Sequence, residues 1–342
     1  MAFKALQKYN FFENMKYTCH FFYTSILIAT VLLCLNLFSF EKYDLKIIGI
    51  NKPAFVVQDS DNKIKKLPFS IYLNKPIYER YSSGKEKHLS AYVSIKYKDN
   101  VEKISISVNQ PYFYHQYGLY LFDIGKTTNN EDYVILRITI SRYRNAVFLG
   151  LLFVILTSLF LMLSSSLSLL KTEKKWVFLG LLSVVTISVV MIIYKMNPML
   201  QNSEIPPILR SVWFLPHVLL FVISYAILIC AWISSGIKLF NKKQNISTDK
   251  IFTIGLTFYT TGLIFGIIWA HFAWGTFWGW DIKETLSLIT FGYGISVLPL
   301  LKNEKVKNNV LFTFFLITVF MVLLLTCWVG PTLFKLGGMH SY

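Results

Sequence analysis

The chain has 342 residues, of which 54% are apolar and only 15% charged; 34 lysines and arginines stand against 18 acidic residues, a formal net charge of +16. A soluble domain carries about 25% charged residues, so this composition excludes a water-soluble enzyme, a disordered protein and a fibrous one. In so apolar a chain, the basic excess indicates the cytoplasmic loops of an integral membrane protein, and we expect no nucleic acid partner.

Seven segments are apolar enough to cross a bilayer as helices, which takes about 20 residues. They are residues 21–40, 146–169, 176–194, 213–235, 251–270, 285–301 and 309–329. The first is long, follows three lysines and lacks a small-residue cleavage site, so we interpret residues 1–40 as an uncleaved anchor. The sixth is the weakest, because it is short and contains Gly292, Gly294 and Pro299.

Lysines cluster in alternate connections between these spans. The loops after the second, fourth and sixth spans are basic, as is the N-terminus. Basic loops mark the cytoplasmic side, so the opposite side receives residues 41–145, 195–212, 271–284 and 330–342. We expect a multi-pass protein of the bacterial inner membrane, in contact with lipid, with its N-terminus inside and its C-terminus outside.

Residues 41–145 have a different pattern, in which apolar and polar residues alternate. The clearest stretches are Ala91-Val93-Ile95, Ile104-Ile106-Val108 and Val134-Leu136-Ile138-Ile140. Alternation with a period of two predicts half-buried strands, and Lys98-Asp99-Asn100 predicts a turn between the first two. The sequence therefore predicts an α-helical polytopic membrane protein of about seven spans with an inserted small extracytoplasmic β domain.

The four cysteines are Cys19, Cys34, Cys230 and Cys327. They are scattered in or beside apolar runs and form no C-x-x-C pair. This spacing indicates neither a disulfide framework, nor a zinc site, nor a thiol oxidoreductase.

The most unusual feature is the tryptophan-rich segment, residues 269–285, which holds four of the eight tryptophans within twelve residues. An aromatic belt at the membrane interface explains some of them. The four indoles do not share one helical face, however, and Gly275 and Gly279 let the backbone bend. We expect an aromatic shelf for a large planar ligand, with Asp281 and Glu284 at the start of the next helix.

Three histidines fall on the same predicted side: His217, His271 and His340. A single interfacial histidine is commonly only a polar residue at the lipid headgroups. Histidines beside an aromatic shelf suggest haem, whose iron takes axial imidazoles. His217 and His340 come from separate segments and could approach from opposite faces, whereas His271 is expected to line the pocket. Arg210, Lys283 and Lys335 could pair with haem propionates or with lipid headgroups.

The residues Trp274-Gly-Thr-Phe-Trp278-Gly-Trp280-Asp281-Ile-Lys283-Glu284-Thr285 resemble the tryptophan-rich WWD signature of haem-handling proteins, most closely in the CcsA (ResC) family of system II cytochrome c synthesis. Trp213-Phe-Leu-Pro-His217-Val218 and Gly338-Met-His340-Ser341-Tyr342 are similar to two other motifs of that family. The resemblance covers roughly residues 205–342. It implies that His217 and His340 bind the haem iron over a signature that includes Trp274, Trp278, Trp280 and Asp281.

A second resemblance covers the β region. Val108-Asn109-Gln110-Pro111-x-x-Tyr114-x-x-Tyr117-x-x-Tyr120 is similar to a stretch near the end of the partner family CcsB (ResB). The chain then resembles a shortened fusion, with an anchor at 1–40, a CcsB-like end at 41–145 and a CcsA-like helical domain at 146–342.

The sequence departs from the family at three positions. Ile282 replaces the usual proline and Leu286 a usual tryptophan, both apolar changes. Pro299 stands where the family has a histidine inside the membrane, and His20 is a poor substitute for the partner histidine. The resemblance therefore supports an outer haem site and does not support a haem site within the membrane.

Three functions are compatible with these features. The first is a holocytochrome c synthase that presents haem b, bound as a substrate, and promotes its thioether attachment to the C-x-x-C-H segment of apocytochrome c. No catalytic residue is assigned. A CcsB-type protein and a thiol reductant are further candidate partners. The second is a haem chaperone or exporter that hands haem to a separate ligase. The third is a haem-free scaffold, which leaves the outer histidines unexplained.

Overall fold

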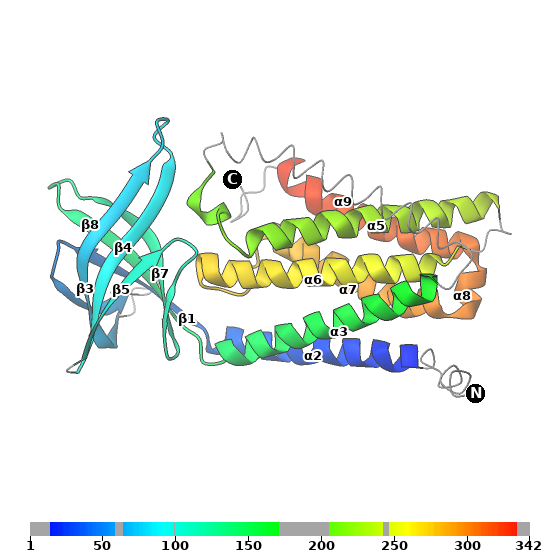
Figure 1. Ribbon diagram of the computed structural model, residues 1–342, viewed down its shortest axis with the longest axis horizontal. Coiled ribbons are helices and arrows are strands. Elements are labelled where there is room, and N and C mark those ends of the chain that lie inside the picture. Colours follow the sequence, from blue (N-terminus) through cyan, green and yellow to red (C-terminus); the bar gives the residue numbers. More distant parts are fainter. Residues whose placement is uncertain (1–13, 59–63, 99, 171–204, 242–245, 334–342) are drawn as a thin grey trace.

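The computed structural model describes residues 14–58, 64–98, 100–170, 205–241 and 246–333, and it places a β domain at one end of a helical bundle (Figure 1). The long helices are α2 (Asn14–Ser39), α3 (Arg144–Leu170), α5 (Phe214–Phe240), α6 (Thr248–Trp274), α7 (Ile282–Lys302) and α9 (Val310–Leu333). Two short elements, η1 (Pro207–Leu209) and α8 (Glu304–Asn308), connect them.

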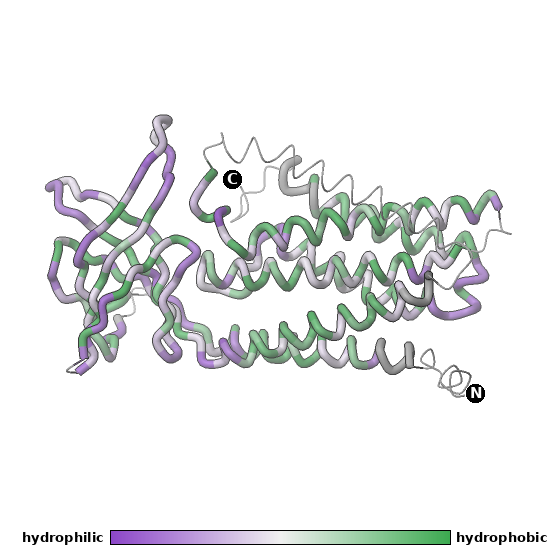
Figure 2. Tube along the Cα trace, in the orientation of Figure 1, coloured by the Kyte–Doolittle hydropathy of each residue, from purple (hydrophilic) through white to green (hydrophobic). Residues whose placement is uncertain are grey.

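Six of the described helices are long and apolar enough to span a membrane, and they coincide with six of the seven predicted spans. The remaining predicted span, residues 176–194, lies outside the described residues. The chain is therefore a polytopic helical membrane protein. Figure 2 shows the apolar residues along the helices and the hydrophilic ones in the β domain and at the far end of the bundle.

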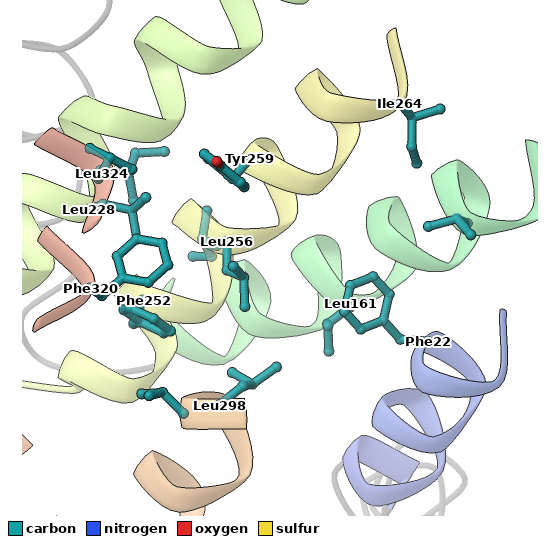
Figure 3. Packing of buried hydrophobic residues seen from close by; sticks show 14 of the residues in the cluster. Phe22, Leu161, Leu228, Phe252, Leu256, Tyr259, Ile264, Leu298, Phe320 and Leu324 are labelled. Atoms are coloured by element: carbon teal, nitrogen blue, oxygen red, sulfur yellow. The ribbon is translucent and has the colours of Figure 1, made fainter. Parts of the chain in front are cut away.

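Helix α6 lies at the centre of the bundle. In its most apolar stretch 83% of the residues are buried, against 39% or less in the other five spans. Figure 3 shows Phe252 and Tyr259 of α6 on the side of α5 and α9, where both rings contact Phe320. The rings of Phe252 and Phe320 meet edge to face at 5.2 Å. Any group held between α5 and α6 is consequently held by the most buried of the six described spans.

The β domain is one antiparallel sheet in the order β5-β4-β3-β2-β1-β8-β7-β6. Its strands are β1 (Glu41–Ile48), β2 (Pro53–Gln58), β3 (Ile64–Arg80), β4 (Glu86–Tyr97), β5 (Asn100–Ser107), β6 (Tyr112–Tyr114), β7 (Tyr117–Lys126) and β8 (Asp132–Ile140). The three predicted alternating stretches fall in β4, β5 and β8, apart from Val108, which directly follows β5. Tyr97 pairs with Asn100 across the predicted turn, where Lys98 adopts a φ of 52°.

The two faces of the sheet have different roles. Alternate residues such as Leu45, Leu136 and Ile138 point into an apolar core and are almost fully buried. The opposite face of β7, β8 and β1 turns toward the helices, and the buried Ser141 hydroxyl donates to the Asn36 side chain on α2 at 2.5 Å. Helix α2 runs into β1 and β8 runs into α3, so the domain is joined to the bundle at both of its ends.

Candidate functional site

The tryptophan-rich segment begins as helix and leaves it at Gly275. Helix α6 ends at Trp274, and Gly275 follows with a φ of 83°, in the left-handed region that glycine tolerates best. A Cβ at this position would lie 2.9 Å from Cγ2 of Thr139 on β8. The stop of the helix and its close approach to the β domain therefore both depend on this glycine.

The segment returns to helix through a capping box. The Asp281 side chain accepts hydrogen bonds from the backbone N–H groups of Lys283 at 2.7 Å and Glu284 at 3.2 Å. The Glu284 carboxylate accepts in turn from the backbone N–H groups of Gly279 at 2.7 Å and Asp281 at 3.3 Å. This arrangement satisfies amide groups that a helix start leaves unpaired, and it confirms the expected helix start.

The four indoles do not form one flat surface. Trp269 is buried and meets Trp274 at 4.9 Å and 56°. Trp278 and Trp280 are nearly perpendicular, at 82° and 6.2 Å. Trp280 is 62% exposed and has a φ of 57°, an uncommon conformation for a bulky residue. The expected flat shelf is instead a set of tilted rings, of which Trp269 and Trp278 line a cavity between the helices.

That cavity, which we call the histidine cavity, has a volume of about 340 Å³. It lies between α5, α6, α7 and α9, and it is lined mainly by apolar and aromatic side chains. The polar or titratable residues of its wall are His217, Tyr225, Lys283, Glu284, Ser287 and Cys327. The cavity thus brings His217 of α5 together with Trp278 and Lys283, two residues of the tryptophan-rich segment that lie far from it in the sequence.

His217 is oriented by α6. Its Nδ1 lies 2.8 Å from the carbonyl oxygen of Gly262, and because a carbonyl can only accept, Nδ1 carries the hydrogen. In the neutral ring the lone pair is then on Nε2, the tautomer with which a histidine binds a metal while its other nitrogen donates to a second-shell carbonyl. Gly266 makes room for this ring, since a Cβ there would lie 2.5 Å from its Cε1.

Trp278 presents a buried polar atom with unmet bonding capacity. Its indole Nε1 is inaccessible and has no hydrogen-bond partner within the described part of the chain. A buried donor without an acceptor costs about 1–3 kcal/mol. The wall of the histidine cavity, which is mainly apolar and aromatic, is suited to a large apolar ligand.

We compared the chain with known proteins. The model of the family described as cytochrome C assembly protein matches residues 145–333, which is more than half of the chain. The chain belongs to this family. Its helices from α3 to α9, and with them His217 and the tryptophan-rich segment, lie within the matched range.

Individual relatives point the same way. The chain is 26% identical to a protein named cytochrome c biogenesis protein CcsA from Phalaenopsis aphrodite subsp. formosana, over 42% of this chain and 61% of that protein. It is 24% identical to the protein of the same name from Manihot esculenta, over 43% of this chain and 61% of that protein. The CcsA protein of Chlamydomonas reinhardtii is 36% identical over 27% of the chain and 31% of its own length. The chain therefore spans at most about three-fifths of the length of these three relatives.

His271, expected as a pocket residue, lies outside the wall of the histidine cavity. It is 1% exposed. Its ring stacks on Phe277 at 4.1 Å and 8° and is parallel to Phe113 of β6 at 5.6 Å and 3°. Its Nε2 lies 3.5 Å from the hydroxyl oxygen of Tyr120 on β7. His271 thus joins the tryptophan-rich segment of this family member to the β domain.

The structure separates the other predicted site residues. Lys283 lines the histidine cavity, whereas Asp281 caps α7. Arg210 contacts the hydroxyl of Tyr81 in the β domain. His340 and Lys335 lie outside the described residues, so the pairing of His217 with His340 stays a prediction.

The structure also places Pro299 and His20, the two residues for which the sequence does not support a haem site within the membrane. Pro299 lies inside α7 toward the end away from the β domain, with its side chain exposed, and His20 on α2 is exposed as well. Neither residue lines the histidine cavity. The described residues contain no group of three or more histidine, cysteine or acidic side chains that could hold a metal ion.

Sequence reasoning missed the supports of the site. Asn109 of the β domain donates through Nδ2 to the carbonyl oxygens of Pro207 and Ile208, both at 2.9 Å, just before α5 begins. Gly262 and Gly266 position His217 from α6. Of these residues only Asn109 lies in a sequence stretch with a family resemblance, the V-N-x-P stretch. A single sequence does not show that α5 packs against α6.

Proposed function

We propose that this chain acts in cytochrome c biogenesis: it presents haem b, bound as a substrate, on the outer face of the membrane and promotes its covalent attachment to apocytochrome c. The observation that carries the proposal is the histidine cavity. There an imidazole with a fixed tautomer faces the same space as a tryptophan and a lysine from the family's tryptophan-rich segment.

Each residue would have a distinct role toward the haem. His217 Nε2 would bind the iron from one side, and His340 would supply the second axial ligand. Trp278, with Trp274 and Trp280 nearby, would contact the apolar porphyrin. Lys283 would pair with a propionate, since an ammonium and a carboxylate form a charge-assisted hydrogen bond. His271 would hold the segment in place from behind.

The charges of the chain support one orientation in the membrane. Lys238, Lys250 and Lys302 belong to the helix ends that lie away from the β domain (Figure 1). If the positive end is cytoplasmic, the β domain, the histidine cavity and His340 are extracytoplasmic, in a bacterial inner membrane. Apocytochrome c would then meet the haem on the side where the β domain lies.

The chemistry required of the protein is mainly positioning. Adding each cysteine S–H of the C-x-x-C-H segment across a haem vinyl group forms one C–S and one C–H bond and consumes the S–H bond and the vinyl π bond, so it is redox-neutral. The thiols supply the nucleophiles, and a thiol reductant would keep them reduced. This chain would hold the haem and exclude alternative geometries.

The test is attachment in cells that express the chain with an apocytochrome c. His217→Ala should abolish covalent haem attachment, because it removes an axial ligand, whereas His88→Ala, on the exposed surface of β4, should leave the yield unchanged. Wild-type yields from His217→Ala would refute the proposal. The spectrum of each purified variant would show whether loss of attachment accompanies loss of bound haem.

The second candidate is a haem chaperone that hands haem to a separate ligase. It is favoured by Pro299, which occupies the family's intramembrane histidine position. Wild-type protein that binds haem but attaches none, when apocytochrome c is its only partner, would support the chaperone. Attachment restored by adding a CcsB-type protein would instead support a synthase that needs that partner.

A further inference from the structure

A second cavity lies between the β domain and the tryptophan-rich segment. It has a volume of about 300 Å³, and we call it the lysine cavity. One wall is formed by Lys42 of β1 and Arg137 of β8, together with Asn36 near the end of α2. The other wall is the stretch from Trp274 to Gly279. Phe277 and Trp278 line both this cavity and the histidine cavity, so the two cavities lie on either side of these residues.

The lysine cavity carries an excess of positive charge. Lys42 and Arg137 project from the same face of adjacent strands, because Asp44 pairs with Arg137 and Lys42 lies two residues from Asp44. Asp44 accepts two hydrogen bonds from the Arg137 guanidinium, at 3.0 and 3.3 Å, and so offsets that charge. The guanidinium also lies over the Phe122 ring at 3.6 Å, which holds it in place. The charge of Lys42 is the one left over.

Lys42 is available to a ligand. Within the described residues its ammonium forms no hydrogen bond or ion pair, and its side chain is exposed. The surrounding protein lowers the pKa of Lys42, chiefly by removing water from the ammonium and secondarily through the nearby Arg137 charge. The Asp44 carboxylate acts in the opposite direction and raises the pKa of Lys42, and an anion in the cavity would act in the same sense as Asp44.

The ligand that fits is a carboxylate attached to a group on the other side of Trp278. A cation meets a carboxylate in a short, charge-assisted hydrogen bond, and the buried Trp278 Nε1 is a donor without an acceptor in the described structure. We propose that Lys42, with Arg137 beside it, binds a propionate carboxylate of the haem held in the histidine cavity, so that the β domain forms part of the haem site. This inference rests on the proposed function.

The proposal divides the two propionates between the two parts of the molecule. Lys283 lies in the histidine cavity and Lys42 in the lysine cavity, on either side of Phe277 and Trp278. A haem gripped at both carboxylates has one orientation in its plane. Its vinyl groups, on the opposite edge of the porphyrin, then point away from the β domain wall. Lys42 is a positioning residue in this scheme and takes no part in bond formation.

The experiment compares haem b with its dimethyl ester, in which both carboxylates are blocked. The purified full chain in detergent is titrated with each, and the dissociation constant is read from the Soret band. Lys42→Gln should weaken the binding of haem b about tenfold, the scale of one charge-assisted contact. It should leave the affinity for the dimethyl ester at the wild-type value. Lys46→Gln is the matched control, because Lys46 lies on the same strand against Tyr133 and outside the cavity.

The outcomes separate this inference from the function on which it rests. If the wild-type chain gives no Soret band with either haem, the proposed function fails and this inference with it. If the wild type binds haem b and Lys42→Gln binds it equally well, only the role of Lys42 is refuted. Equal weakening for haem b and its ester would show that Lys42 supports the fold and would also refute the role. The role of Lys42 toward haem is also refuted if Lys42→Gln changes only the binding of the chain to vesicles of anionic lipid, since the lysine would then bind lipid headgroups.

Discussion

The fit of His217 against Gly266 makes a sharp prediction for Gly266→Ala. An alanine Cβ would lie 2.5 Å from Cε1 and 2.7 Å from Nδ1 of the imidazole, whereas carbon atoms in contact are about 3.5 Å apart. The ring must therefore move by about 1 Å. Its Nδ1 is now 2.8 Å from the Gly262 carbonyl oxygen, so such a shift away from α6 would break that hydrogen bond.

The expected loss falls on haem affinity and not on folding. Mutating a second-shell partner of a metal-binding histidine typically costs 10–100-fold in affinity, and we expect Gly266→Ala to weaken haem b binding within that range. Alanine favours a helix over glycine by about 1 kcal/mol, so the variant should still fold. Soret titration measures the affinity, and thermal unfolding checks the fold.

Gly292→Ala on α7 is the matched control for this experiment. It makes the same substitution in a membrane-spanning helix, at a position where a Cβ would have no neighbour within 4 Å. It should keep wild-type haem affinity. Wild-type affinity in Gly266→Ala as well would refute the assignment of His217 as the ligand held by α6.

Two further predictions concern the β domain. Asn109→Asp should weaken the contact between the β domain and the segment before α5 more than Asn109→Ala does, because a carboxylate would face the carbonyl oxygens of Pro207 and Ile208. Limited proteolysis of that segment measures the loss of contact. Equal cleavage of both variants would contradict the prediction. The pKa of Glu41 is lowered chiefly by its hydrogen bond from Lys65. This contact therefore stabilises the folded chain at pH values above 4.5, the pKa of the unfolded state, and the stabilisation is lost as the pH falls through the lower pKa of the folded state. Both side chains are more than a third exposed, so Lys65→Met should lower the free energy of unfolding by less than ~1 kcal/mol at pH 7 and should not change it at acid pH. Thermal unfolding at both pH values measures the loss. A loss of stability that does not depend on pH would refute the role of this ion pair.

The features that sequence reasoning predicted are those set by neighbouring residues. Six spans follow from apolar runs of sufficient length, and strands β4, β5 and β8 follow from alternation. The start of α7 at Asp281 follows from the preference of aspartate for helix starts, whereas α6 runs four residues beyond the predicted end at residue 270 and stops at Gly275. All of these are decided within a few positions of the chain.

The features that escaped prediction depend on contacts between distant segments. The sheet order places β8 beside β1, although about ninety residues separate them, and this pairing brings Arg137 to Lys42. His271 has the sequence context of a pocket residue, yet Phe113 of the β domain covers it. A flat shelf was expected because the glycines allow one, but ring angles depend on packing that spacing alone does not determine.

The position of the β domain acquires a physical reason from these contacts. The loop between α6 and α7 is held at its ends by the glycine stop and by the capping box. The β domain contacts the first of these ends, because Phe113 lies parallel to His271 in the last turn of α6 and Thr139 lies close to Gly275; the domain enters the chain directly between α2 and α3. A rigid support of this kind keeps the rings that line the histidine cavity in one geometry, which is what a site that orients a substrate requires. If the histidine cavity binds haem as proposed, changes on the helix-facing surface of the β domain should alter haem affinity, even at positions such as Thr139 that lie outside the family motifs.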